Sequence, residues 1–292
     1  MAQPDMNSAA VEVQDLTRAF HVNGRVAMAL DGVSLSLGRA ETLGIVGESG
    51  SGKSTLGRII AGLEWQTSGR LLHEGVDLAT LPRAQRRARL QRVQMIFQDP
   101  YASLNPRLSI GRQIHETLRP SGQTRYAENR ALAARLIERV GLPADTVDRY
   151  AHEFSGGQRQ RIAIARAIAT NPSVIVADEP VSALDVTIRE QIIALMEDLK
   201  GETAYLFISH DMAVVARICD RIAVMYRGQV VEMGTTEEVI GNPQHAYTRS
   251  LLEAVPRVGR RRTGARLIPW QPESAVQKPL EAVSPTHQVR PG

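Results

Sequence analysis

A glycine-rich segment at residues 47–55 constrains this chain more than any other feature. It follows an apolar run, 42–46, and precedes a helix-compatible run, 56–63. A strand, a glycine-rich turn and a helix in this order are the setting of a P-loop. The glycines let successive N–H groups face an anion, and the helix directs the positive end of its dipole at the same point. The segment reads Gly47, Glu48, Ser49, Gly50, Ser51, Gly52, Lys53, Ser54 and Thr55. We therefore predict that the chain binds a nucleoside triphosphate.

Two side chains of this segment have predictable roles. The Lys53 ammonium would place a positive charge at the β- and γ-phosphates, and the Ser54 hydroxyl would hold Mg²⁺. A second acidic partner for the metal is found further along. Asp178 and Glu179 end a buried-type apolar run, 174–177. A strand that ends beside a P-loop delivers such an aspartate to the Mg²⁺ shell.

Glu179 is the predicted general base. It lies one residue beyond Asp178 and could polarise a water molecule for attack on the γ-phosphate. The alternative is that the two acids cap the following helix. That alternative fits poorly because Pro180 follows directly. The pair indicates a hydrolase rather than a kinase.

Composition sets the outer limits of the fold. With 292 residues, 43% of them hydrophobic, the chain can form one large domain or a domain with an appendage. The single cysteine, Cys219, excludes an internal disulfide and favours a reducing compartment. No apolar run approaches the roughly 18 residues of a membrane-spanning helix, and the first ten residues do not resemble a signal peptide. We expect a cytoplasmic location.

Basic residues are concentrated in two segments, although the net charge is only +4. A solvated face and a flexible basic tail are the favoured interpretation. Contact with anionic lipid headgroups or nucleic acid is the alternative. No aromatic residues are interleaved with these arginines, which weakens the case for nucleic-acid binding, and we expect no nucleic-acid partner. The clusters are Arg83, Arg86, Arg87, Arg89 and Arg92, and Arg257, Arg260, Arg261, Arg262 and Arg266.

Periodicity and turn signals predict an α/β order of elements. Antiparallel strands are expected over 11–37 and 70–77, a charged helix over 82–92 and a strand over 93–97. A helical region follows over 110–166, with its clearest amphipathic stretch at 128–140. Strands at 173–177 and 204–208, joined by a helix at 186–199, predict a parallel βαβ unit. Then come a hairpin over 222–233, a helix over 246–255 and a loose final stretch, 256–292.

A third motif identifies a family. Phe154, Ser155, Gly156, Gly157 and Gln158 open a helix. Ser155 is a natural N-cap, and the two glycines expose N–H groups to a second anion. We find no reason within the fold for so much glycine at a helix start. The segment is similar to the signature loop of ABC-type ATPases.

Other motifs of that family follow in the expected order. Gln98 corresponds to the Q-loop, residues 182–185 to the D-loop and His210 to the histidine after the next strand. Phe20 matches the aromatic residue that stacks on adenine. The resemblance covers about residues 9–240. A small-molecule kinase would explain neither the signature loop nor His210.

The resemblance implies a fold, cofactors and a division of roles. The fold is an α/β P-loop NTPase with a RecA-like mixed sheet, an N-terminal antiparallel β subdomain and an inserted helical subdomain. We expect the ATPase domain over 9–241, its helical subdomain over about 100–166, and a C-terminal extension over 242–292 whose distal part is flexible. ATP and Mg²⁺ are the implied cofactors, with Ser54, Gln98 and Asp178 around the metal.

Two such subunits sandwich two ATP molecules in this family. Ser155, Gly156, Gly157 and Gln158 would then serve the ATP of the partner subunit, whereas Glu179, His210 and Gln98 would act on the chain's own ATP. The remaining histidines are expected to be structural or solvated: His21, His73, His115, His152, His245 and His287.

Two further stretches resemble ATPases of oligopeptide, dipeptide and nickel importers. One is 99–107, after the Q-loop, and the other is 242–252. The resemblance implies two membrane-spanning permease subunits, an external solute-binding protein and a peripheral position on the cytoplasmic face of the membrane. It favours pairing with a second, related ATPase over a homodimer. Some relatives carry a cysteine cluster for an iron–sulfur centre, which a single cysteine cannot form.

One alternative stays open. A soluble ABC ATPase accessory to a metabolic complex, of the carbon–phosphorus lyase type, shares much of this motif set. The single uninterrupted cassette favours the importer over soluble translation or DNA-repair machines. The cargo, whether peptide, nickel or a related small solute, leaves no mark on an ATPase subunit.

Overall fold

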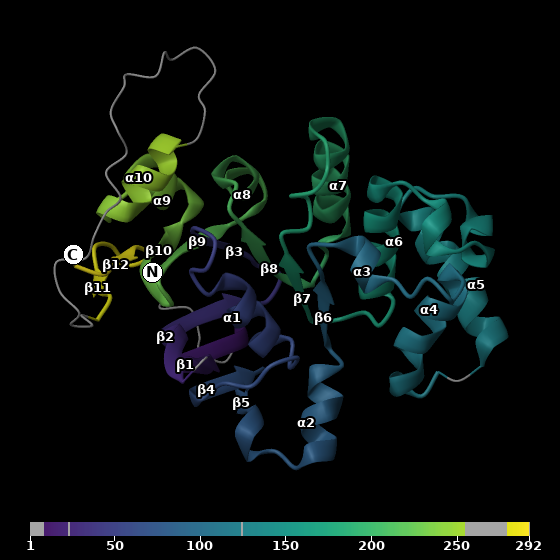
Figure 1. The fold of residues 1–292 in the computed structure, drawn as a ribbon, viewed down its shortest axis with the longest axis horizontal. Coiled ribbons are helices and arrows are strands. Elements are labelled where there is room, and N and C mark those ends of the chain that lie inside the picture. The colour runs from purple at the N-terminus through teal and green to yellow at the C-terminus, as the bar shows by residue number, and fades with distance from the viewer. Residues whose placement is uncertain (1–8, 23, 124, 255–278, 292) are drawn as a thin grey trace.

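The protein is described by a computed structural model that covers residues 9–22, 24–123, 125–254 and 279–291. Two sheets organise it (Figure 1). The smaller has the strand order β2-β1-β4-β5 and the larger the order β11-β12-β10-β9-β3-β8-β7-β6. A separate helical subdomain stands beyond the β6 edge. The predicted combination of a mixed sheet, an antiparallel subdomain and a helical subdomain is confirmed.

The antiparallel subdomain joins two predicted pieces into one sheet. β1 pairs with β2 on one side and with β4 on the other. The apolar residues of β1 and β2 that alternate along the strands face α1 and the larger sheet. The strands are β1 (Ala9–Val22), β2 (Arg25–Gly38), β4 (Ser68–His73) and β5 (Val76–Asp77).

The larger sheet has a parallel centre. β3, β6, β7, β8 and β9 run parallel, and β10 returns antiparallel to β9 as the predicted hairpin. Every residue of β3, β7 and β8 is buried, as expected of strands covered on both faces. The strands are β3 (Thr42–Val46), β6 (Val93–Ile96), β7 (Val174–Asp178), β8 (Ala204–Ser209), β9 (Arg221–Tyr226) and β10 (Gln229–Thr235).

Helices cover both faces of this sheet. α1 (Lys53–Ile60) packs between the two sheets and shares their apolar core. The opposite face carries α7 (Val186–Leu199) and α8 (Met212–Ile218), whose core continues into the helical subdomain. That subdomain contains α3 (Pro100–Ser103), α4 (Ile110–Leu118), α5 (Tyr126–Arg139) and α6 (Gly156–Ile168). The predicted crossover helix between β7 and β8 is confirmed.

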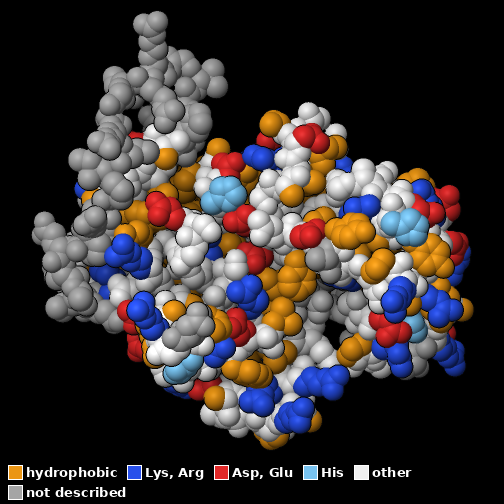
Figure 2. Space-filling view, viewed as in Figure 1, with side chains coloured by type: hydrophobic (Ala, Val, Ile, Leu, Met, Phe, Trp, Pro, Cys, Tyr) orange, Lys and Arg blue, Asp and Glu red, His pale blue; other side chains and the backbone are white. Residues whose placement is uncertain are grey.

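The predicted charged helix is α2 (Arg83–Leu90), none of whose residues is buried. Its arginines form a basic area at the lower edge of the face in Figure 2. Beside it the surface is hollowed between α2 and the helical subdomain. No helix within the described ranges is long and apolar enough to cross a membrane.

The C-terminal region differs from the prediction of a loose tail. After α9 (Thr236–Gly241) and α10 (Ala246–Ala254), residues 279–291 form the hairpin β11 (Glu281–Ala282) and β12 (Gln288–Val289), which extends the sheet beside β10. Backbone pairing and a buried contact of His287 with Glu232 fix it there. Residues 256–278 of the expected tail lie outside the described residues.

Candidate nucleotide-binding and hydrolysis site

The P-loop connects β3 to α1 and is packed tightly at two of its glycines. A Cβ on Gly47 would lie 2.1 Å from the Met225 carbonyl oxygen, and one on Gly52 would lie 2.3 Å from that of Ala29. Both glycines also have positive φ, 153° and 102°. Neighbouring strands therefore require glycine at these two positions.

Lys53 points back into the loop. Its Nζ donates hydrogen bonds to the carbonyl oxygens of Gly47 and Glu48, both at 2.7 Å, and to Ser51 Oγ at 3.3 Å. Burial lowers the pKa of Lys53, whereas the nearby carboxylates of Glu179, Asp178 and Glu48 act to raise it. The ammonium is thus held at the floor of the loop by groups that a phosphate could replace.

Ser54 and Asp178 meet beside this lysine. Ser54 Oγ donates a hydrogen bond of 2.9 Å to Asp178 Oδ1, from the first turn of α1 to the last residue of β7. Burial raises the pKa of Asp178, and the hydrogen bond from Ser54 partly counters this. Hydroxyl and carboxylate oxygens are the donors that Mg²⁺ prefers.

Three predicted catalytic residues converge at the ends of three adjacent parallel strands. Glu179 follows β7, Gln98 follows β6 closely, and His210 follows β8. Gln98 Nε2 donates to Glu179 Oε2 at 3.0 Å, and His210 Nδ1 lies 3.1 Å from Glu179 Oε1. The carboxyl ends of parallel strands share one edge of a sheet, which is where ligands bind in open α/β folds.

The backbone of Glu179 is itself unusual. It has a φ of 47°, in the left-handed region that non-glycine residues rarely adopt, and its N–H donates to the Ile208 carbonyl at 2.9 Å. Such a conformation costs free energy of order 1–3 kcal/mol and persists where the surroundings over-determine it. Here it turns the carboxylate of Glu179 toward both Gln98 and His210.

These residues line one cavity of about 700 Å³. Its walls include Ser49, Gly50, Gly52, Lys53, Ser54, Thr55, Gln98, Glu179 and His210. The sequence did not point to Ala29 and Arg58, which also line it. The spacing contains a signal for Arg58, because it lies four residues after Ser54 on α1 and so shares its face.

The signature segment lies elsewhere. Ser155 caps α6, with Gln158 N–H donating to Ser155 Oγ at 3.4 Å and Ser155 N–H donating to Gln158 Oε1 at 2.9 Å. None of these residues lines the cavity of the same chain. The prediction that the fold itself gives no reason for glycine here was wrong for Gly157. A Cβ on Gly157 would lie 2.5 Å from Ile188 Cγ2, so packing requires glycine there. A Cβ on Gly156 would meet only Leu184, at 3.8 Å.

Phe20 lies on β1, next to the cavity wall contributed by β2. It pairs with Ala27 across the sheet, and the Arg18 guanidinium covers its ring at 4.5 Å from the ring centre. Phe20 does not itself line the cavity. The structure thus brings together the P-loop and the three predicted catalytic residues, and leaves the signature segment and Phe20 outside.

Comparison with known proteins defines the class. Residues 30–182 match the family model of the ABC transporter, and residues 231–280 match that of the oligopeptide/dipeptide transporter C-terminal region. The fold resembles cbiO1 from Clostridium perfringens, with a TM-score of 0.69 and 26% identity over 80% of this chain and 92% of that one. It also resembles the dimeric cassette MJ0796 bound to ADP and Pi, with a TM-score of 0.68 and 29% identity over 77% and 98%. The fold is that of an ABC-type ATPase.

Sequence relatives narrow the family further. The dipeptide transport ATP-binding protein DppF of Haemophilus influenzae is 50% identical over 79% of this chain and 71% of its own length. The glutathione import ATP-binding protein GsiA of Escherichia coli is 56% identical over 80% of this chain and 38% of its own length. The chain belongs to the oligopeptide/dipeptide import family of ABC transporter ATP-binding proteins. It binds ATP and couples its hydrolysis to transport.

Proposed function

We propose that this chain energises the uptake of peptides or closely related small solutes, with Glu179 as the catalytic base. The observation that carries the hydrolytic assignment is the contact of both Glu179 carboxylate oxygens, with Gln98 at 3.0 Å and His210 at 3.1 Å, in the wall of the P-loop cavity. A carboxylate held at that point can accept a proton from water that attacks the γ-phosphate. His210 would position that water and the phosphate, as a positioning residue does in phosphoryl transfer.

Mg²⁺ fits the oxygen donors beside the P-loop. Ser54 Oγ and Asp178 Oδ1 lie 2.9 Å apart, and Gln98 supplies an amide at the same edge of the sheet. When bound, the ion would neutralise charge on the β- and γ-phosphates. Lys53 would exchange its two backbone carbonyl partners for phosphate oxygens, and the N–H groups at the start of α1 would bind the same anion.

The signature segment supports a site shared between two subunits. Ser155 and Gln158 lie outside the cavity of their own chain, so they can reach an ATP molecule only across an interface. The dimeric state named for the cassette MJ0796 is in keeping with this arrangement. We propose that the partner is a second, related ATPase rather than another copy of this chain.

A groove beside the helical subdomain is the proposed seat of the membrane subunits. It has a volume of about 790 Å³ and lies between the end of α1, the α2 helix and the region after β6 (Figure 2). Leu63 lines it and is 58% exposed. Leu90, Met95 and Phe97 also line it, and a groove with several apolar side chains is typical of a protein contact. Docking there would hold the chain at the cytoplasmic face of the membrane, with two permease subunits and, through them, a solute-binding protein.

The peptide cargo is inferred from relatives alone. DppF is named for dipeptide transport and GsiA for glutathione import, and both names describe peptide-like solutes. An ATPase subunit does not contact the solute.

Gentle affinity purification from detergent-solubilised membranes of the native cells tests the whole assignment. Two multispanning proteins, a second ATPase and a solute-binding protein should accompany the tagged chain, and the purified binding protein should retain a peptide ligand. Recovery of soluble enzyme subunits instead would remove the transport role while leaving the ATPase chemistry intact. Recovery of two copies of this chain without a second ATPase would contradict the proposed heterodimer.

A substitution in the groove tests the docking surface separately. Leu63→Glu should reduce recovery of the membrane subunits, because it places a charge in an apolar contact, while ATP binding by the chain stays unchanged. Val283→Glu is a matched control, since Val283 is 50% exposed but lies on the C-terminal hairpin. Equal recovery of permeases with both variants would contradict docking at this groove.

A further inference from the structure

The P-loop is held by a side chain from the far end of the sequence. The Glu48 N–H donates a hydrogen bond of 2.9 Å to the hydroxyl of Tyr247, across 199 residues. Tyr247 lies on α10, is 2% exposed, and packs against Tyr226 with 4.5 Å between ring centres. A residue of the C-terminal region thus touches the backbone of the ATP-binding loop.

This hydrogen bond fixes the plane of one peptide group. The C=O of Gly47 and the N–H of Glu48 belong to the same peptide unit, and in a trans peptide they point in opposite directions. The Gly47 carbonyl accepts from Lys53 Nζ at 2.7 Å, while the Glu48 N–H reaches Tyr247. The peptide is therefore held from both sides, with Lys53 on the cavity side.

Without the hydroxyl this peptide would be held from the Lys53 side alone and could rotate more easily. Gly47 has no Cβ, and glycine populates positive and negative φ with similar ease. Rotation would turn the carbonyl of Gly47 away from Lys53. The Glu48 N–H would otherwise face an apolar ring edge with no acceptor, which is unfavourable for a partly buried donor.

Tyr247 is suited to this contact by its environment. Burial raises the pKa of Tyr247 to about 12, so its hydroxyl stays protonated at neutral pH. A neutral hydroxyl both accepts the N–H and adds no charge beside the phosphates. The side chain is also immobilised, because its ring is enclosed in the core that lies under α8 and β9.

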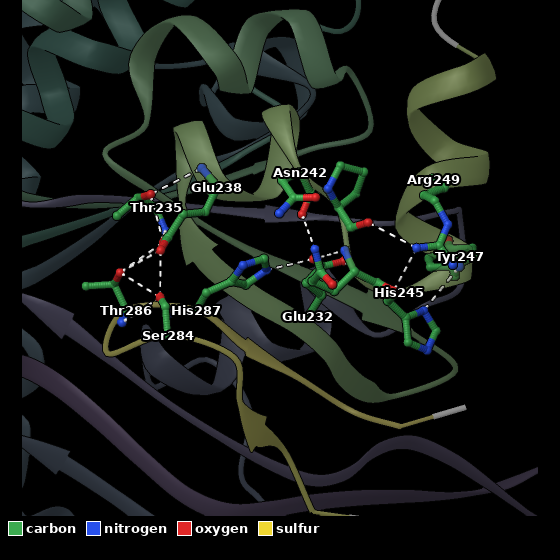
Figure 3. A network of polar contacts seen from close by, with 12 residues as sticks. Glu232, Thr235, Glu238, Asn242, His245, Tyr247, Arg249, Ser284, Thr286 and His287 are labelled. Atoms are coloured by element: carbon green, nitrogen blue, oxygen red, sulfur yellow. Dashed lines mark hydrogen bonds and ion pairs between the residues drawn. The ribbon is translucent and has the colours of Figure 1, made fainter.

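A buried carboxylate holds the segment that carries Tyr247 (Figure 3). Glu232 on β10 is fully buried, and its two oxygens accept from the N–H groups of Gln244 at 2.7 Å and His245 at 3.0 Å. His245 Nδ1 then accepts from the Tyr247 N–H at 3.1 Å. These bonds fix the turn into α10 and with it the direction of the tyrosine.

The C-terminal hairpin completes this support. His287, between β11 and β12, places its Nε2 2.7 Å from Glu232 Oε1, and both side chains are buried. Ser284 and Thr286 of the same hairpin donate to Glu238 at 2.7 and 2.8 Å. The contacts run continuously from the hairpin through Glu232 to the P-loop.

We propose that Tyr247 is a positioning residue of the ATP site, which sets the Gly47–Glu48 peptide and thereby the position of Lys53. Glu232 holds Tyr247 in place for this role. The inference rests on the proposed assignment of Lys53 and the P-loop to ATP.

The test is Tyr247→Phe, measured in the assembled transporter by ATP hydrolysis and in the chain by ATP binding. KM and Kd for ATP should rise about 5- to 50-fold with kcat nearly unchanged, because loss of one buried acceptor weakens binding in the ground and transition states alike. Tyr205→Phe is the matched control. Tyr205 is 3% exposed and lies at the opposite end of β8 from the site, so its loss should leave KM unchanged.

Amide hydrogen exchange supplies a second measurement that does not depend on ATP. The Glu48 N–H should exchange faster in Tyr247→Phe than in the unsubstituted chain, whereas Tyr205→Phe should not change it. An unchanged KM together with unchanged exchange at Glu48 would overturn the inference. Lys53→Ala separates the two hypotheses: if it binds ATP normally, the P-loop assignment fails, and if it loses binding while Tyr247→Phe is unaffected, only the role of Tyr247 fails.

Discussion

Two helices in this protein begin at glycine-rich segments, and they differ in how their first N–H groups are treated. At α1, the P-loop helix, the N-cap is Gly52 and makes no side-chain cap. At α6, the signature helix, Ser155 and Gln158 form a reciprocal capping box. The first four N–H groups of any helix lack partners within the helix. An anion is therefore the natural partner for the first N–H groups of α1, whereas at α6 the capping box pairs the N–H groups of Ser155 and Gln158.

This difference in capping between α1 and α6 corresponds to two halves of the proposed ATP site. The P-loop half is assembled within one chain, where Lys53, Glu179 and His210 line the same cavity. The signature half carries its own capping box and lies outside that cavity. Ser155 Oγ accepts from the Gln158 N–H as the cap, and its O–H could donate to a phosphate of a second ATP molecule at the same time. The proposed function therefore requires a second subunit to bring Ser155 to an ATP molecule.

Glu179→Gln should have the largest effect on ATP turnover and falls wholly in the P-loop half. Hydrolysis by the assembled transporter should drop about 10²–10⁴-fold, the usual contribution of a general base. ATP binding should persist, because glutamine preserves the shape and the contacts with Gln98 and His210. The measurement is steady-state phosphate release beside equilibrium ATP binding.

The matched control is Lys53→Ala, which removes a phosphate contact rather than a base. It should weaken ATP binding itself. Turnover by Glu179→Gln at the rate of the unsubstituted protein would show that the base has been misassigned.

Ser155→Ala should have the next largest effect on ATP turnover, and it tests the signature half. Hydrolysis by the dimer should fall about 10- to 100-fold, as expected for loss of one hydrogen bond to a charged group. ATP binding by the isolated chain should not change, because Ser155 lies outside its cavity. Thr235→Ala is the control, since Thr235 also forms a capping box, on α9. Each variant should lose about 1 kcal/mol of stability, so equal activities would contradict a role of Ser155 at ATP.

Acid should act through His73 on the antiparallel sheet that packs against α1, with the smallest effect on ATP turnover at neutral pH. Burial lowers the pKa of His73 on β4 from 6.5 to about 4. The unfolded chain then binds the proton more readily than the folded one, so stability falls as the pH drops below about 6.5. Above that pH the His73 imidazole is neutral in both the folded and the unfolded chain, and no stability is lost. At pH 5 the cost is roughly 2 kcal/mol.

Denaturant unfolding at pH 7.5 and pH 5 checks this value. His73→Gln should remove that part of the acid sensitivity, whereas His152→Gln should not, because His152 is exposed near the signature segment. Identical pH profiles for the two variants would show that His73 is not the group responsible.

The sequence predicted the elements that carry the chemistry with little error. The crossover helix 186–199 has the predicted bounds, strand 174–178 is shifted by one residue from the predicted 173–177, and strand 204–209 is one residue longer than the predicted 204–208. These elements are long and strongly patterned, so local preference and burial agree. The P-loop was recognisable because close approach of Met225 and Ala29 leaves room there for glycine alone.

Other features were decided by contacts between distant segments. The strands of the C-terminal hairpin contain two residues each, too few to show any periodicity, and they form because β10 offers an unpaired edge. Gly157 was interpreted as a ligand-binding glycine alone, although Ile188 on α7 also packs where its side chain would be.

The sequence by itself determined that this chain is an ABC-type ATPase, and it predicted the P-loop, the base and the signature loop, because a phosphate cradle needs its residues at fixed local spacing. The tertiary structure decided which of them share a cavity, and it brought Tyr247 to the P-loop across 199 residues. Local spacing follows from backbone geometry, whereas the neighbours of a buried side chain depend on how the whole core packs.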